Sequence, residues 1–399
     1  MTGTRNRSGK KVPAGAFGPV SFVAVFLCLA IVPLRASAYQ SSSPDSLAKA
    51  QALAVAIDST AEGPHIYWKD DSTAYVFYLC DGEVFSRGLR LADSLLFAGF
   101  CADSATRYSF AAAPPAVEPH VFDDVPRILT VSDIHGEYDA LVDLLKNADV
   151  IDSDLHWNWG DGHLVVLGDV FDRGDGVTEC LLLIHRLERE AKQSGGRVHL
   201  TLGNHEEMAL RGDLRYVNEK YTKGIADRTG IPYNDLFGPH MELGRWLRTK
   251  HTAIRLNHIL FVHGGFSPEV VERQLALDTI NEATRRSMDY FSYQLLFSDL
   301  EWFLLSDAGP LWYRGYHEAR SEYPRATAAQ LDTILAFYDA ETIVVGHHEV
   351  GQVSNWYQGR VYGVDVPVPE LGGLQALLWE DGEFFRVLGS GDREALSRP

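Results

Sequence analysis

Basic side chains are scarce in this sequence relative to acidic ones. The 399 residues include 36 Lys and Arg against 54 Asp and Glu, and the formal net charge at pH 7 is −18. This excess of negative charge argues against nonspecific binding to nucleic acid or to anionic lipid. It does not exclude an anionic substrate, because bound cations can reverse the field around a site. We therefore expect no nucleic-acid partner.

Cysteine is also rare, with four residues in the chain. Cys28 lies in an apolar N-terminal stretch and lacks the small residues that precede a lipidated cysteine. Cys80 and Cys101 could pair in an oxidising compartment, and the sequence leaves that pairing open. Cys180 lies on a predicted helix and is expected to be a small buried apolar residue.

The first 38 residues have the pattern of a secretory signal peptide. Four basic residues lie between positions 5 and 11, a mostly apolar stretch runs from 16 to 34, and Ala36-Ser37-Ala38 is a small-residue cleavage site. We expect cleavage near Ala38 and export of the chain to the periplasm or the extracellular space. The alternative is an uncleaved membrane anchor; after cleavage no stable membrane span is expected.

Residues 39–118 are expected to form a linker followed by a small accessory β domain. Strand-like runs at 65–68, 74–79 and 83–85 are separated by polar turns, which is typical of a small antiparallel unit. A helical period at 46–57 precedes these strands. The sequence does not indicate what the unit does.

Residues 119–399 are expected to form an α/β catalytic domain, because strand–loop–helix repeats begin at Arg127. Apolar runs predict strand segments at 128–131, 164–167, 197–202, 254–262 and 342–345, and a final hairpin at 374–388 that closes the sheet. A polar cluster follows each of the five segments. In open α/β sheets the loops beyond the carboxyl ends of strands converge on one crevice, so these clusters are expected to meet.

The polar clusters carry side chains that suit divalent metal ions. Asp133 and His135 are two residues apart, and on an extended segment they would point to one side and bind one ion. Asp169 has two carboxylate oxygens and could bridge two cations about 3.5–4 Å apart. The remaining donors are the amide oxygen of Asn204 and the imidazole nitrogens of His263 and His347. Such a ligand set without thiolates suits Mn, Fe or Zn.

Each cluster has an ordinary structural explanation when it is taken alone. A D-x-H pair is often a solvated loop acid beside a capping histidine, and a lone histidine is often a hydrogen-bonded core residue. His348 beside His347 also leaves open which ring would bind. Together the clusters are more specific, with steps of 36 residues from Asp133 to Asp169 and 35 from Asp169 to Asn204. Each step fits one strand–helix unit of about 30 residues or more.

The motifs resemble those of the calcineurin-like metallophosphoesterases and, more narrowly, of the phosphoprotein phosphatase family. The resemblance is carried by Asp133-Ile134-His135, Gly168 to Gly174, Gly203-Asn204-His205-Glu206, His263-Gly264-Gly265 and Gly309 to Gly315. The Asp172-Arg173-Gly174 ending and the last two motifs together are similar to its bacterial-type branch, the Shewanella-like protein phosphatases. The resemblance covers roughly Arg127 to Leu388 and implies a central β-sandwich of sheets flanked by helices.

The resemblance also implies two divalent metal ions, with Mn, Fe or Zn as candidates. One ion would be held by Asp133, His135 and Asp169, and the other by Asp169, Asn204, His263 and His347. Asp169 would bridge the two ions, and Asn204 would also lie beside the substrate.

Four further residues receive roles from the resemblance. Arg173 and Arg314 would grip phosphate oxygens, because arginine forks match phosphate bidentately. His205, oriented by Asp172, would donate a proton to the leaving oxygen. Two structural alternatives stay open: Arg173 could pair with Asp172, and Arg314 could lie against an aromatic ring.

The resemblance implies two-metal hydrolysis of phosphate monoesters by attack of a metal-activated hydroxide, with a phosphorylated protein or a small phosphoester as substrate. One alternative is hydrolysis of dinucleoside polyphosphates or other phosphoanhydrides at the same centre. Similar tetraphosphate hydrolases usually lack an acid at the position of Asp172, so its presence favours the first activity. Another alternative is an inactive binding or scaffold protein, in which lost ligands would be expected, whereas every expected position is filled here.

Overall fold

The computed structural model describes residues 61–90, 94–98, 107–111, 113–288, 297–368 and 373–397. The predicted signal peptide, the helix predicted at 46–57 and Cys101 lie outside these ranges. Cys80 takes part in a disulfide bond, and its pairing with Cys101 stays a prediction. Among the described residues, no helix is both long enough and apolar enough to cross a membrane.

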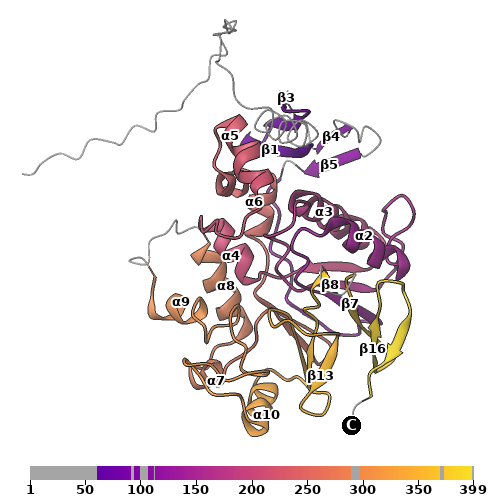
Figure 1. Ribbon diagram of the computed structural model, residues 1–399, viewed down its shortest axis with the longest axis vertical. Coiled ribbons are helices and arrows are strands. Elements are labelled where there is room, and N and C mark those ends of the chain that lie inside the picture. Colours follow the sequence, from indigo (N-terminus) through magenta and orange to yellow (C-terminus); the bar gives the residue numbers. More distant parts are fainter. Residues whose placement is uncertain are drawn as a thin grey trace, which may run out of the picture. The chain divides into compact units, whose positions relative to one another are not determined.

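Two six-stranded sheets form the centre of the fold (Figure 1). The first consists of β7 (Arg127–Val131), β8 (His163–Val166), β9 (Arg197–Leu200), β15 (Ala376–Glu380), β16 (Glu383–Val387) and β17 (Arg393–Ala395), in the order β17-β16-β15-β7-β8-β9. The second consists of β6 (Val121–Phe122), β10 (Ala253–Leu256), β11 (Ile259–Val262), β12 (Thr342–Val345), β13 (Ser354–Trp356) and β14 (Val361–Gly363), in the order β13-β14-β12-β11-β10-β6.

Strand direction brings the carboxyl ends of the central strands together. β7, β8 and β9 run parallel, with Leu129 opposite Leu164 and Leu164 opposite Val198. β11 and β12 also run parallel, with Leu260 opposite Ile343. All five strand segments predicted from apolar runs are present, and the polar clusters that follow them lie at these ends.

The predicted final hairpin is present as β15 and β16, but it does not close the sheet. β17 pairs with β16 through Val387 and Arg393 and forms the edge. All three residues of β17 are exposed. No apolar pattern therefore marks this strand in the sequence, and the prediction of a closing hairpin was wrong.

Apolar side chains from the two sheets meet between them. This core includes Ile128, Val165 and Leu167 from the first sheet and Leu256, Phe261 and Val344 from the second, each at most 1% exposed. Helices α2 (Tyr138–Asn147) and α3 (Val177–Gln193) cover the first sheet, and α7 (Pro268–Glu272), α8 (Leu277–Ser287), α9 (Asp299–Leu304) and α10 (Ala328–Phe337) pack with the second. The arrangement confirms the predicted β-sandwich flanked by helices.

Five short helical elements fill the connection between β9 and β10. They are α4 (Asn204–Leu210), the π-helix η1 (Lys220–Ile225), α5 (Ala226–Thr229), the 3-10 helix η2 (Tyr233–Phe237) and α6 (Glu242–Leu247). A π-helix is an uncommon element that is frequent at functional sites.

The predicted antiparallel unit before the sandwich is confirmed as β1 (Glu62–Asp70), β2 (Thr73–Cys80) and β3 (Glu83–Arg90), and a separate pair follows as β4 (Ser94–Ala98) and β5 (Arg107–Ala111). The three-stranded sheet contacts the region around α6. There Trp68 Nε1 donates a 2.5 Å hydrogen bond to Glu242, and Trp68 N–H donates to His240 O at 2.8 Å. Residues 50–399 cluster as one compact unit, and a division at residue 118 stays a prediction.

Candidate metal centre

Side chains from five loops gather at the carboxyl ends of the strands. Asp133 and His135 follow β7, Asp169 follows β8, Asn204 and His205 open α4, His263 follows β11, and His347 follows β12. Two groups have ligand atoms within 4.8 Å of one another: His135, Asp169 and His205 in one, and Asp169, His263 and His347 in the other. Asp169 belongs to both groups and connects the two halves of the site.

Asp169 lies at the centre of the site and is 2% exposed. Its Oδ2 is 3.2 Å from His263 Nε2 and 3.9 Å from the Nε2 atoms of His135 and His205. Its Oδ1 accepts a 3.0 Å hydrogen bond from the backbone N–H of His205. One carboxylate oxygen therefore faces three imidazole nitrogens, while the other is fixed to the first turn of α4.

Asp133 and His135 lie in a turn and not on an extended segment, so the alternation argument used for them was wrong. Both have left-handed backbone conformations, with φ of 52° and 47°. Their N–H groups donate to the backbone oxygens of Gly168 and Asp169, which bends the chain around the loop after β8. His135 Nε2 is nevertheless 4.0 Å from Asp133 Oδ1. Two atoms at that separation can share an ion that binds each at about 2.0–2.2 Å.

Backbone carbonyls orient three of the histidines. His135 Nδ1 lies 2.6 Å from Phe171 O, His263 Nδ1 lies 2.8 Å from Leu167 O, and His347 Nε2 lies 3.1 Å from Trp312 O. A ring nitrogen that donates to a carbonyl carries the proton, so the opposite nitrogen keeps its lone pair. The nitrogens left for a metal are Nε2 of His135, Nε2 of His263 and Nδ1 of His347.

Burial and carboxylate charge act against each other at the histidines of the site. Burial prevails at His135, whose pKa is lowered to about 4, and at His347, whose pKa lies well below its usual value. Burial alone would lower the pKa of His263, but the carboxylates of Asp169 and Asp133 raise it to about 10. Burial also opposes the rise in the pKa of His205, which Asp169 and Asp172 produce. A buried carboxylate that draws protons onto imidazoles attracts divalent cations as well, because either positive charge offsets the same field.

His205 and Asp172 form the hydrogen-bonded pair that the resemblance implies. His205 Nδ1 is 2.9 Å from Asp172 Oδ2. Asp172 is 1% exposed, and burial raises its pKa while the hydrogen bond of His205 opposes the rise. The other ring nitrogen of His205, Nε2, points toward Asp169. His205 is therefore placed both as a proton donor and as a competing metal ligand.

Glu206 has a structural function at the start of α4. Its carboxylate accepts hydrogen bonds from the backbone N–H groups of Gly203, Asp169 and Val170 at 2.7, 2.8 and 2.8 Å. It is fully buried, and burial together with Asp169 raises its pKa to about 7. Glu206 thus caps α4 and also holds the Asp169 loop against that helix.

The loops after β8 and β9 approach each other closely at Gly168. This glycine has φ of 78°, and a Cβ there would lie 2.6 Å from the backbone nitrogen of Gly203. A Cβ at Gly174 would lie 2.4 Å from the backbone oxygen of His135. The glycines at the two ends of the motif are therefore required by close contact, and this contact brings Asp169 beside α4.

The two arginines differ in how they are held. One Nη atom of Arg314 donates to His347 O, and the other lies 3.4 Å from His347 Nδ1. Arg173 has a 52% exposed side chain, and its Nη1 lies 3.7 Å from Glu349 Oε1. Among the described residues the other oxygen of Asp172, Oδ1, has no hydrogen-bond partner, so Arg173 is not paired with Asp172. Arg314 contacts the metal centre directly, whereas the Arg173 side chain extends toward solvent.

The neighbours His347 and His348 point in different directions. His347 lies with its ring centroid 5.1 Å from that of His263. His348 stacks on His317, with centroids 4.4 Å apart and an angle of 7° between the ring planes. Of the two histidines, His347 is the one that joins the cluster around Asp169.

Asp365 is a buried acid near the centre that the motifs do not include. It is 5% exposed, and burial together with the charges of Asp133 and Asp169 raises its pKa to about 9. It follows β14, which runs parallel to β12 with Val345 opposite Gly363. Strand topology therefore places it at the same edge of the sheet, although nothing in its local sequence indicates that position.

The donor set fits a pair of divalent cations. Asn204 Oδ1 lies 3.0 Å from His263 Nε2 and adds an amide oxygen to the second group. Oxygen and imidazole donors without thiolates suit Mn, Fe or Zn.

Cys180, the free cysteine of the described residues, is buried in α3.

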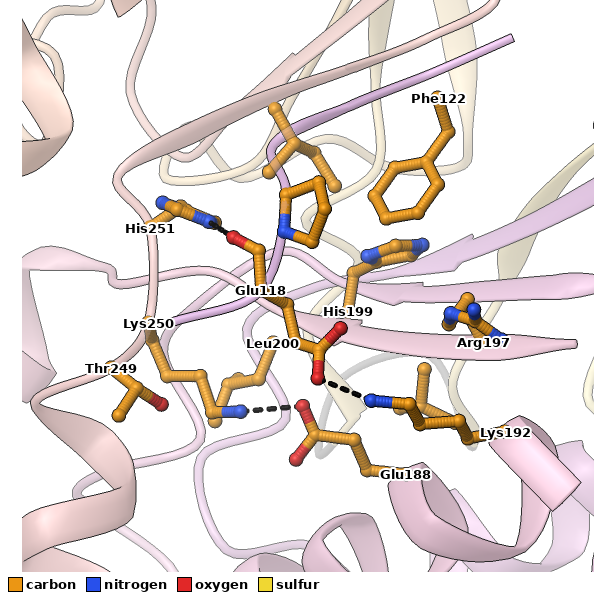
Figure 2. A pocket seen from close by; sticks show the side chains of 13 residues that line it. Glu118, Phe122, Glu188, Lys192, Arg197, His199, Leu200, Thr249, Lys250 and His251 are labelled. Atoms are coloured by element: carbon orange, nitrogen blue, oxygen red, sulfur yellow. Dashed lines mark hydrogen bonds and ion pairs between the residues drawn. The ribbon is translucent and has the colours of Figure 1, made fainter. Parts of the chain in front are cut away.

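A second histidine-rich region, which we call the β9 hollow, lies beside β9 (Figure 2). It is lined by residues that include Glu118, Phe122, Glu188, Lys192, His199, Lys250 and His251. Lys250 lies 2.5 Å from Glu188, Lys192 lies 2.6 Å from Glu118, and His251 lies 2.7 Å from Glu118 O. The carboxylates of Glu118 and Glu188 are thus paired within the protein, which leaves the hollow poorly suited to bind a cation.

Residues 126–350 match the family model of the calcineurin-like phosphoesterases. The chain is 29% identical over 235 residues to Shewanella-like protein phosphatase 1 of Plasmodium berghei, a match that covers 57% of this chain and 64% of that protein. It is 30% identical over 207 residues to Shewanella-like protein phosphatase 2 of Arabidopsis thaliana, covering 41% and 52%. The chain thus spans less than two thirds of the length of these two relatives.

A solved structure extends the similarity beyond the family region. The cold-active protein-tyrosine phosphatase of a psychrophilic Shewanella species superposes with a TM-score of 0.77 at 34% identity. The match covers 85% of this chain and 100% of that one.

Proposed function

The chain belongs to the calcineurin-like phosphoesterase family, and on this premise we propose that it hydrolyses phosphate monoesters on phosphorylated proteins with two divalent metal ions. The observation that carries the proposal is the double grouping around Asp169, with the His205–Asp172 pair beside it. The relatives support a protein substrate, since two are named protein phosphatases and one is named a protein-tyrosine phosphatase.

The metal ligands are proposed as the resemblance implies. Asp133, His135 and Asp169 would hold one ion, and Asp169, Asn204, His263 and His347 would hold the other. When bound, the two cations would lower the pKa of a water molecule and offset the charge that builds on the phosphoryl oxygens.

The protein's own side chains bind the phosphate and move a proton. Arg314 is fixed against His347 and presents a guanidinium at the edge of the centre, and Arg173 is free to swing from Glu349 onto a phosphate oxygen. His205 keeps a proton on Nε2 for the leaving oxygen, because the carboxylates of Asp169 and Asp172 raise its pKa. Asp172 holds Nδ1 and fixes the direction of that transfer. Asn204 lies where its amide can also contact the substrate.

The alternatives gain no support from the structure. A dinucleoside polyphosphate hydrolase would not require the acid at Asp172, which is buried and bonded to the proposed proton donor. An inactive scaffold would not require the full donor set around Asp169.

Metal identity and cellular location belong to the same proposal. Manganese is one of three ions that the donor types suit, with iron and zinc. Export follows from the signal-peptide pattern before Ala38. An exported enzyme would meet phosphoproteins outside the cytosol.

A substrate panel tests the proposed activity. The metal-loaded full chain would be assayed on phosphotyrosine, phosphoserine and phosphothreonine peptides, on a small aryl phosphate and on a dinucleoside tetraphosphate. We expect kcat/KM for a phosphopeptide to exceed that for the dinucleotide by about 100-fold or more. The reverse preference would make the enzyme a phosphoanhydride hydrolase, and metal binding without any turnover would favour a binding protein.

A further inference from the structure

Lys220, the first residue of the π-helix η1, places its ammonium group among oxygens from three elements. Its Nζ is 2.6 Å from Asp175 O, 3.0 Å from Glu179 Oε1 and 3.2 Å from Glu62 Oε2. Glu62 opens β1, Glu179 lies in the first turn of α3, and Asp175 follows Arg173 by two residues. One largely buried cation thus links the N-terminal sheet to the loop that carries a proposed phosphate-binding arginine.

The carboxylate of Glu62 contacts three polar side chains. It is 3% exposed, its Oε1 accepts a 2.5 Å hydrogen bond from Thr178 Oγ1, and the same oxygen lies 3.0 Å from His65 Nε2. Burial alone would raise its pKa, but the hydrogen bond of His65 and the charge of Lys220 lower it. Removing one partner of a buried ion pair is strongly destabilising locally, because the other charge is left without compensation. The contact between Glu62 and Lys220 therefore constrains both elements.

The segment before Lys220 holds the backbone of Arg173 directly. The N–H of Arg173 donates to Tyr216 O at 2.9 Å, and Asn218 Nδ2 donates to Arg173 O at 2.9 Å. The N–H of Lys220 donates in turn to Asn218 Oδ1 at 2.9 Å. Arg173 has φ of 63°. A non-glycine residue keeps such a conformation only when surrounding contacts impose it.

Tyr221 provides a second connection between η1 and the same loop. Its hydroxyl donates to Asp175 O at 2.7 Å and accepts from the N–H of Val177 at 2.7 Å. The side chain is fully buried. Adjacent residues of the π-helix, Lys220 and Tyr221, thus both bind the backbone of this loop, which matches the frequent placement of π-helical turns at functional sites.

We propose that the N-terminal sheet positions the phosphate-binding loop: Glu62 fixes Lys220, and Lys220 together with Asn218 fixes the backbone of residues 173–175. This inference rests on the proposed function, in which Arg173 binds phosphate. Glu62 is then a positioning residue that touches neither substrate nor metal. Loss of the Glu62 carboxylate weakens phosphate binding by Arg173 and leaves the metal ions in place.

Hydrogen exchange in the full-length chain tests the positioning without an activity assay. Glu62→Gln and Lys220→Met should each speed exchange of the amides of residues 173–177 by about tenfold or more, because the loop opens more often. Lys223→Met is the matched control, since Lys223 lies on the same π-helix but pairs only with exposed Glu219 at 2.7 Å. Exchange that is unchanged in the Glu62 and Lys220 variants would overturn the proposal.

Kinetics then test whether the loop acts through Arg173. In Glu62→Gln we expect KM for a phosphopeptide and Ki for inorganic phosphate to rise about tenfold, with wild-type metal content. In an Arg173→Ala background, Glu62→Gln should change KM and Ki by less than about twofold. A rise in KM and Ki as large as that in the wild-type background would contradict the inference. If Glu62→Gln does not fold, Thr178→Val removes a single donor to Glu62 and should show the same pattern more weakly.

The two proposals fail in distinguishable ways. A wild-type protein that does not hydrolyse phosphopeptides would contradict the proposed function, while the hydrogen-exchange result would still decide whether Glu62 and Lys220 hold residues 173–177. Active wild type with unchanged exchange in the variants would contradict only the positioning.

Discussion

The metal centre and the β9 hollow both gather histidines, but different groups face the imidazole rings. At the metal centre one oxygen of Asp169 lies within 3.9 Å of three ring nitrogens. In the β9 hollow, His199 Nε2 lies 3.0 Å from another imidazole, that of His163. Burial, His163 and the nearby cations Lys250 and Arg197 hold the pKa of His199 well below its usual value. The imidazoles thus surround a carboxylate in one place and lie beside another imidazole and two cations in the other.

The difference lies in whether the carboxylates are already paired. In the β9 hollow, Glu188 and Glu118 are neutralised by Lys250 and Lys192. At the metal centre, Asp169 faces imidazoles, whose charge depends on the protons they hold. A cation can therefore replace those protons at the metal centre. In the β9 hollow both carboxylates are already paired with lysines, so a further cation would gain little there. Histidine content alone would not distinguish the two regions.

The largest effect is expected from Asp169→Asn, which removes the charge shared by both halves of the metal centre. The variant should lose both ions and lower turnover by more than about 10³-fold. Elemental analysis and phosphopeptide turnover check this. Glu188→Gln, the matched change in the β9 hollow, should keep wild-type metal content. Normal metal content in Asp169→Asn would rule out the bridging assignment.

His205→Ala should slow turnover by about 10²–10⁴-fold while both ions stay bound, because it removes the proton donor and no ligand. Metal content and kcat measured on the same preparation separate the two roles. Loss of an ion would instead make His205 a ligand, as its grouping with His135 and Asp169 allows.

Replacing His347 and His348 separately should give unequal results. His347→Ala should lose one of the two ions, since its ring joins the cluster, and kcat should fall by about 10²-fold. His348→Ala should keep both ions, because that ring stacks on His317. Equal metal loss in the two variants would contradict the placement of these rings.

The smallest effect is expected at His163, whose ring contacts His199 of the β9 hollow, and concerns stability in acid. Burial and Arg197 lower the pKa of His163 from 6.5 to about 4, so the unfolded chain binds more protons between those values. The stability contributed by the neutral ring is present above about pH 6.5 and is lost as the pH falls toward 4. His163→Gln keeps a polar partner for His199 but does not titrate.

The Tm of His163→Gln should therefore fall less than that of wild type between pH 7 and pH 5, and turnover at pH 7 should stay within about twofold of wild type. Calorimetry at the two pH values checks the first expectation. A decline as steep as that of wild type would show that the ring is not held neutral.

The strands and the gathering of polar loops could be predicted from the sequence. The strands β7, β8 and β12 end two or three residues before Asp133, Asp169 and His347, and parallel strands bring such ends together. The candidate metal ligands could be named from the sequence because carboxylate, amide and imidazole groups bind divalent metals. Their order and spacing identified the family.

Features that depend on contacts between distant segments could not be predicted. Asp365 reaches the centre only because β14 pairs with β12. The turn at Asp133 and His135 is imposed by hydrogen bonds to the loop after β8. Glu62 lies 158 positions before Lys220 in the chain, and no local pattern links the two. Each of these depends on which segments meet in the folded protein, which local periodicity does not encode.

Metal content of the purified full-length protein tests the central claim most directly. We predict two divalent ions per chain in the wild type, loss of phosphopeptide turnover when a chelator removes them, and recovery when Mn, Fe or Zn is added back. Turnover that persists undiminished in protein stripped of metal would contradict a two-metal centre around Asp169.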